Sequence, residues 1–207
     1  DEEPATTTQS AALKTQNSKL ETENLTGSAD EVYNVFALPV ESPAHGGRTL
    51  VVNPADPVAS PYGWHDDNGQ TGPEYTYTRG NNVRAYEDRD FNNSPVLSEY
   101  VTGVNGTFDF PYNPNAEPAA NLEAAVTNLF YMNNMMHDRF YKFGFDEQAG
   151  NFQHNNYGRG GAANDAVRAE GLDGGGENNA NFSTPADGTA GRMQMYLWSG
   201  QSGNIVT

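Results

Sequence analysis

Residues 122–143 read LEAAVTNLFYMNNMMHDRFYKF. Apolar side chains recur in this stretch at steps of three and four positions, which is the period of one face of an α-helix. Pro118 suits a first helical turn, and Gly144 stands where a C-terminal cap is expected. The apolar stripe consists of Leu122, Val126, Leu129, Met132, Met136, Phe140 and Phe143. The pattern therefore predicts one long amphipathic helix, and its stripe needs a partner surface.

Short runs of β-branched and aromatic residues occur on both sides of this helix. Residues 41–73 carry many Pro, Gly, Asn and Asp, which predicts an extended, loop-rich segment lying on a larger body. The glycine run 174–176 predicts a turn. Strands are predicted at 33–38, 49–52, 107–110, 166–170 and 193–198, with a hairpin from 75–78 and 83–86. The residues thus predict an α+β fold.

Composition excludes several classes of function. The 207 residues contain 11 Lys+Arg against 27 Asp+Glu, for a net charge of -16, which disfavours nucleic acids and anionic membranes as partners. There are no cysteines, so disulfides and thiolate metal sites are excluded. Residues 1–30 are polar and predict a disordered or extended arm. We expect Asp1 to follow a removed signal peptide or an expression boundary.

The run Asn178-Asn179-Ala180-Asn181-Phe182 is the most unusual polar sequence in the chain. Asparagines fill a core poorly, but they suit the edge of a sheet, where amides and unpaired backbone groups can meet an extended partner. The run therefore predicts a peptide-binding edge.

Two other sets of residues have both a functional and a structural interpretation. The loop Asp66-Asp67-Asn68-Gly69 has the oxygen ligands and the turn glycine of a calcium site, but Tyr77 stands where a calcium loop carries glutamate, and a solvated acidic turn is the alternative. His137 is a candidate metal ligand or base; the favoured alternative is a helix histidine bonded to a nearby backbone group or carboxylate. The sequence contains neither an HExxH zinc pair nor a Gly-x-Ser-x-Gly elbow.

Several ordered motifs resemble the fungalysin family of thermolysin-like zinc metallopeptidases. They span roughly residues 31 to 200 and include unusual combinations of Tyr, Trp, Asn and Gly. The matching stretches are 33–39 (YNVFALP), 59–66 (ASPYGWHD), 79–83 (RGNNV), 85–88 (AYED), 128–131 (NLFY), 137–138 (HD) with Tyr141, 144–147 (GFDE), 150–153 (GNFQ), 158–161 (GRGG), 164–167 (NDAV), 178–182 (NNANF), 191–193 (GRM) and 195–196 (MY).

The resemblance implies the N-terminal lobe of a two-lobed protease for residues 31–207. It implies a twisted, mainly antiparallel sheet with the long helix packed under it. The asparagine run is similar to the family's substrate-binding edge strand, which makes Asn178, Asn179, Ala180 and Asn181 the predicted substrate-binding residues. On that match, the Asn179 side chain and the Ala180 backbone bond an extended peptide.

The resemblance also implies what these 207 residues lack. In the family, an HExxH helix and a downstream glutamate hold zinc and follow this region, so the segment alone is expected to be inactive. Residues 199–207 would lead toward that helix, and residues 1–30 would be the end of a propeptide or a linker. The implied function is a secreted zinc-dependent endopeptidase. Its expected partners are peptide substrates, the rest of the catalytic domain and its own propeptide.

Two functions of other classes remain open at this stage. One is a non-catalytic module that binds peptide or a protease partner, and the other is an acidic structural domain of a surface protein. A longer gene encoding HExxH would favour the protease, and a natural stop after Thr207 would favour the binding module.

Overall fold

The computed structural model describes residues 30–198, which form one long helix and seven strands. The predicted arm 1–30, apart from its last residue, and the segment 199–207 lie outside the described residues. The strands are β1 (Val32–Val35), β2 (Thr49–Val52), β3 (Val83–Glu87), β4 (Thr107–Phe108), β5 (Val167–Glu177), β6 (Ala180–Ser183) and β7 (Arg192–Leu197). The helices are α2 (Leu122–Tyr141) and the 3-10 turns η2 (Leu97–Glu99), η3 (Pro118–Asn121) and η4 (Glu147–Ala149).

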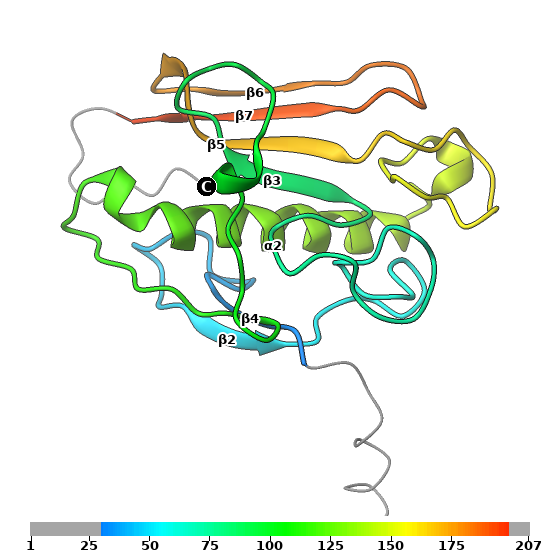
Figure 1. Ribbon diagram of the computed structural model, residues 1–207, viewed down its shortest axis with the longest axis horizontal. Helices are drawn as coiled ribbons and strands as arrows, with labels where there is room; N and C mark the ends of the chain where they lie inside the picture. The colour runs from blue at the N-terminus through cyan, green and yellow to red at the C-terminus, as the bar shows by residue number, and fades with distance from the viewer. Residues whose placement is uncertain (1–29, 199–207) are drawn as a thin grey trace, which may run out of the picture.

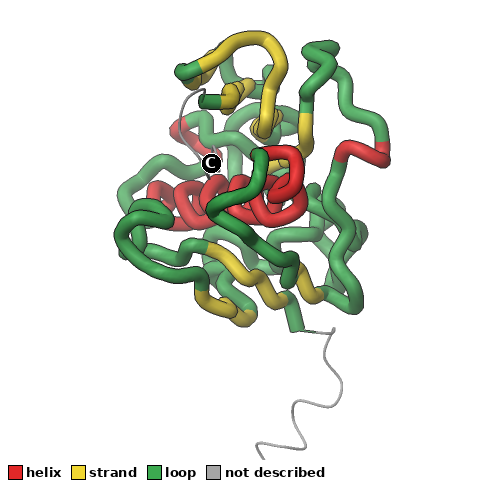
Figure 2. Tube along the Cα trace, turned by 90° about the vertical axis from the view of Figure 1, so that its left-hand side faces the viewer, coloured by secondary structure: helices red, strands yellow, loops and turns green. Residues whose placement is uncertain are grey.

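Helix α2 confirms the predicted long helix. Pro118 opens the 3-10 turn η3, which leads directly into α2. At the other end Gly144 has a left-handed backbone (φ 92°), and its N–H bonds to the carbonyl of Tyr141. The helix lies between the two sheets, with the four-stranded sheet on one side and the smaller sheet on the other (Figures 1 and 2).

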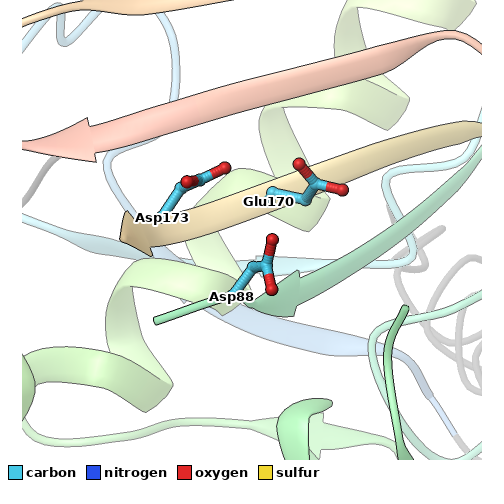
Figure 3. A group of neighbouring side chains, drawn as sticks. All are labelled: Asp88, Glu170 and Asp173. Atoms are coloured by element: carbon cyan, nitrogen blue, oxygen red, sulfur yellow. The ribbon is translucent and has the colours of Figure 1, made fainter. Parts of the chain in front are cut away.

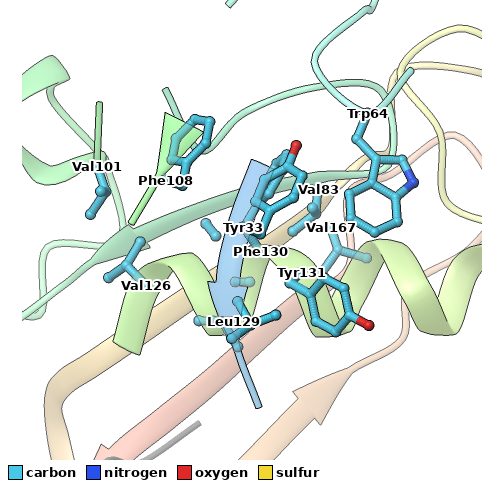
Figure 4. Close-up of a cluster of buried hydrophobic side chains, with 13 residues drawn as sticks. Tyr33, Trp64, Val83, Val101, Phe108, Val126, Leu129, Phe130, Tyr131 and Val167 are labelled. Carbon is cyan, nitrogen blue, oxygen red and sulfur yellow. The ribbon is translucent and has the colours of Figure 1, made fainter. Parts of the chain in front are cut away.

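Aromatic side chains from three elements form the core between α2 and the smaller sheet (Figure 4). The Tyr33 ring of β1 stacks on Phe108 of β4 at 5.3 Å, and Phe130 of α2 lies 6.1 Å from Tyr33. His65 is buried in the same stack, 4.7 Å from Phe130, and this burial lowers its pKa. The loop-rich segment therefore contributes to the core.

The prediction of a mainly antiparallel sheet is wrong in its strand directions, although the α+β class is confirmed. The four-stranded sheet has the order β3-β5-β7-β6, in which β3–β5 and β5–β7 are parallel and only β6–β7 is antiparallel. The predicted hairpin of 75–78 with 83–86 is reduced to an isolated bridge, Arg79 to Arg84, and β3 pairs along its length with β5.

The glycine run 174–176 lies inside β5 and does not form the predicted turn. A Cβ atom on Gly174 would lie 2.2 Å from the Arg89 carbonyl oxygen, and one on Gly175 would lie 2.4 Å from the Phe91 ring. These glycines therefore allow the connection between β3 and β4 to approach the sheet closely. The pairing of β5 with β7 shifts register on either side of Asp173.

The buried carboxylate of Asp138 fixes the loop-rich segment to α2. It accepts hydrogen bonds from Ser60 Oγ (2.7 Å), Trp64 Nε1 (2.9 Å) and the backbone N–H of Asp56 (2.9 Å). The segment therefore holds its shape by bonding to the helix, as the sequence predicts.

Candidate peptide-binding edge and apolar groove

Strand β6, which includes most of the asparagine run, is the outer strand of the four-stranded sheet. It is bonded on one side to β7, with Ala180 opposite Met195 and Ser183 opposite Arg192, and all four of its residues are exposed. In Figure 1 it forms the upper border of the sheet. The run therefore lies at a sheet edge, in the position that the sequence predicts.

The residues before β6 set its register. Asn178 has a left-handed backbone (φ 55°), and its N–H donates to the Leu197 carbonyl at 2.8 Å. Asparagine tolerates this backbone region better than most residues. The Asn179 carbonyl accepts from the Tyr196 N–H at 3.3 Å, which fastens the start of the edge to β7.

The Asn179 side chain covers the first backbone donor of the edge. Its Oδ1 accepts from the Ala180 N–H at 2.8 Å, and both residues are exposed. An extended ligand could use both groups only if the amide side chain rotates away from the backbone. A ligand that competes for these groups can therefore replace the hydrogen bond between the Ala180 N–H and Asn179 Oδ1.

Asn181 has a different environment from Asn179. Its amide nitrogen donates to Tyr196 Oη at 2.7 Å and to Gln194 Oε1 at 3.2 Å, both on the neighbouring strand β7. Its side chain therefore supports the edge strand through the sheet. The structure brings together all four predicted residues, and the side chain of Asn179 bonds within the edge itself.

An apolar groove of about 520 Å³ runs beside this edge, between α2 and the sheet. The exposed part of the helix stripe lines it: Met136 is 39% exposed and Phe140 48%. On the sheet side the lining includes Phe182 of β6 and Met193 and Met195 of β7. The stripe is thus covered at Val126 and Leu129 but not toward its C-terminal end within the described residues.

His137 borders the groove and has the predicted structural role. Its Nδ1 lies 2.9 Å from Asp138 Oδ1, and its Nε2 lies 3.3 Å from the Asn151 amide nitrogen. The other three histidines are distributed over the chain: His45 bonds to Ser42, His65 is in the core, and His154 lies 3.9 Å from Asp67. The histidines do not converge on one site.

The oxygens of the Asp66–Gly69 loop already have donors. Asp66 accepts from the Gly69 N–H, and Asp67 accepts from the Tyr75 hydroxyl at 2.6 Å. The Arg79 guanidinium lies 3.6 Å from Asp67, where it competes with a cation. Burial raises the pKa of Asp66 to about 6. Calcium binding by this loop remains a prediction.

The residues present do not fit a catalytic zinc ion. Within the described residues 30–198, three side chains of the kinds that bind metals lie close enough together to hold an ion: Asp88, Glu170 and Asp173. All three are buried carboxylates. Catalytic zinc sites generally include histidine, which this group lacks. The cluster could not be recognised from the sequence, because Asp88 and Asp173 are 85 positions apart and no local motif joins the three residues.

Comparison with known proteins identifies the family to which this chain is similar. Residues 32–205 match the model of the fungalysin metallopeptidases (M36). The chain is 43% identical over 183 residues to extracellular metalloproteinase 5 of Trichophyton tonsurans, covering 86% of this chain and 30% of the relative. It is 45% identical over 179 residues to extracellular metalloproteinase 2 of Phaeosphaeria nodorum, covering 84% and 27%. These relatives are metallopeptidases by name.

The chain belongs to the fungalysin metallopeptidase family. It spans about a third or less of the length of the relatives it matches. The family implies a metal ion. None of the helices in the described residues is long and apolar enough to cross a membrane.

Proposed function

We propose that this chain is the substrate-binding part of the N-terminal lobe of a secreted zinc endopeptidase. In this proposal residues 31–207 belong to the lobe, and the zinc ligands and the catalytic base come from chain beyond Thr207. The observation that carries the proposal is the exposed edge strand β6, with the Asn179–Ala180 pair at its start. Family membership and the extracellular relatives support it.

The edge binds substrate by strand addition. A peptide lying antiparallel or parallel to β6 exchanges backbone hydrogen bonds with it, which holds the peptide extended at a fixed depth. Asn179 rotates its amide away from the Ala180 N–H and bonds the peptide, so the Ala180 backbone becomes free to pair. Asn178 and Asn181 keep the strand in register through Leu197, Gln194 and Tyr196.

The apolar groove supports the proposal that further chain completes the catalytic domain. An open groove of about 520 Å³ between α2 and the sheet is a surface that a soluble protein normally covers. The relatives are more than three times longer than their matched parts, so they contain further chain that can fill such a groove. Because the described residues do not fit a catalytic zinc ion, we expect residues 1–207 alone to hydrolyse no peptide.

The test is Asn179→Ala in the protein expressed from its complete gene. Loss of one or two positioning hydrogen bonds, at about 1.5 kcal/mol each, should lower kcat/KM by about 10- to 100-fold. The matched control is Ser183→Ala, an exposed residue of the same strand that should leave kcat/KM unchanged. Equal kinetics for the Asn179 variant and the parent would remove Asn179 from the site.

A second measurement separates the protease from a binding module. If purified residues 1–207 show zinc-dependent peptidase activity, the catalytic centre cannot lie beyond Thr207. If the complete protein binds peptide at the edge but never cleaves it, the non-catalytic alternative replaces the proposal.

A further inference from the structure

We infer that Asp88, Glu170 and Asp173 form a binding site for a hard divalent cation of the calcium class, which fastens the connection between β3 and β4 to the sheet. The site lies on the face of the four-stranded sheet opposite α2, and Gln194 bonds both to Asp173 of the cluster and to Asn181 of the proposed substrate edge. Each residue offers a carboxylate oxygen, and these oxygens lie within 4.8 Å of one another. Figure 3 shows the three side chains as neighbours, with Glu170 and Asp173 on β5 and Asp88 beside them at the end of β3.

The backbone positions these carboxylates firmly. Asp88 directly follows β3; its N–H bonds to the Gly171 carbonyl of β5, and its own carbonyl accepts from Gly174 at 2.9 Å. The Asp88 carboxylate also accepts from the N–H groups of Asn92 and Asn93 at the start of the connection. A cation bound here would therefore hold the connection and β5 at one point.

Glu170 provides the independent sign of a missing ligand. The side chain is fully buried, and its Oε1 accepts from the Tyr86 hydroxyl at 2.7 Å. Its Oε2 is also buried but has no hydrogen-bond partner. A buried carboxylate oxygen without a partner is costly, and a bound cation would satisfy it.

The charge around the cluster is also unbalanced. Among the described residues, Arg192 is the cation within ion-pair distance of these carboxylates, with its Nε 3.8 Å from Glu170 Oε2. Three carboxylates beside one guanidinium leave an excess of two negative charges, which a divalent ion neutralises.

The donor chemistry selects the class of cation. The ligands are carboxylate oxygens without histidine or thiolate, which suits Ca²⁺ better than Zn²⁺. Asp173 is itself held by the Gln194 amide at 2.7 Å and by the Gly175 N–H at 2.6 Å. These bonds orient the Asp173 carboxylate, as outer partners orient the ligands of known metal sites.

The experiment uses the protein expressed from its complete gene, freed of calcium with EGTA and titrated with Ca²⁺ and with Tb³⁺. Tyrosine excitation sensitises bound Tb³⁺, and Tyr86 lies next to the cluster. Glu170→Gln and Asp173→Asn should each remove about one equivalent of bound ion relative to the parent. Glu117→Gln, an exposed carboxylate before η3 and outside both acidic groups, is the matched control and should retain it.

Thermal unfolding provides a readout that does not depend on counting ions. Ca²⁺ should raise the Tm of the parent by several degrees, because it binds the folded state alone. Glu170→Gln should lose this rise, yet in EGTA it should melt at or above the parent, because it removes a buried uncompensated charge and keeps an acceptor for Tyr86.

Two results would overturn the inference. One is a parent protein whose Tm does not respond to Ca²⁺, which would indicate that the cluster is neutralised by protons alone. The other is equal ion stoichiometry in the parent and in Glu170→Gln. If Asp173→Asn fails to fold, the Glu170 variant still decides the question.

Discussion

The two faces of the four-stranded sheet bury different kinds of side chain. The face toward α2 is apolar, with Val83, Ala85, Val167 and Ala169 in the core. The opposite face is also buried, but by polar groups: Tyr86, Glu170 and Gln194 are each at most 3% exposed beneath the connection between β3 and β4. The comparison shows that burial in this protein is not confined to apolar residues.

The faces also differ in how their contacts are completed. On the apolar face, packing is continuous near Val126 and ends in an open groove at Met136. On the polar face the connection covers the sheet, but one carboxylate oxygen of Glu170 is left without a donor. The apolar face therefore ends in an uncovered groove, and the polar face contains a buried carboxylate oxygen whose nearest cation among the described residues, Arg192, lies 3.8 Å away.

The largest expected effect is on the apolar face. Val126→Asp places an unpaired charge in a fully buried position of α2, which should cost more than about 4 kcal/mol and prevent folding. Circular dichroism melts of the complete protein measure this loss. Glu123→Asp on the same helix, at an exposed position, should melt close to the parent. A folded Val126→Asp protein would contradict the claim that the face toward α2 is an apolar core, unlike the opposite face.

Met136→Glu should have an intermediate effect in the complete protein. Met136 is 39% exposed in the groove here, and if further chain covers it, a charge at this position should cost about 1–3 kcal/mol. Chemical denaturation measures this change. Val104→Glu is the control, because Val104 is 71% exposed and lies outside the groove. Equal stability of both variants and the parent would mean that the groove stays open.

The smallest effect is expected on the polar face. Tyr86→Phe removes the hydroxyl that donates to Glu170 at 2.7 Å, while the ring that packs against Tyr100 remains. The expected loss is about 1–2 kcal/mol in EGTA, since a charged acceptor loses its donor. It should be smaller with Ca²⁺ bound, which denaturation curves in the two buffers can compare. A larger loss with Ca²⁺ than with EGTA would contradict the link to the cation.

The elements themselves were largely predictable from the sequence. The period of the stripe at residues 122–143 gave α2 and its glycine cap, and local β signals gave β2 and β7 nearly to the residue. The asparagine run was predicted at a sheet edge because its composition is unsuited to a core, and β6 is that edge.

The pairing of strands and the polar face were not predictable in the same way. Parallel pairing of β3 with β5 joins residues 84 positions apart, and no local signal records it. Isolated acids such as Asp88 and Glu170 resemble the many surface acids of a chain with net charge -16. Only the fold brings them together, and the glycines of β5 allow the connection to cover them.

The Asp138 carboxylate has a consequence for the resistance of the chain to proteolysis. Proteases cleave extended, poorly anchored chain most readily. The loop-rich stretch from residue 56 to residue 64 has the composition of such a target, but three donors along it are bound to one buried side chain of α2. The helix therefore protects this stretch from cleavage.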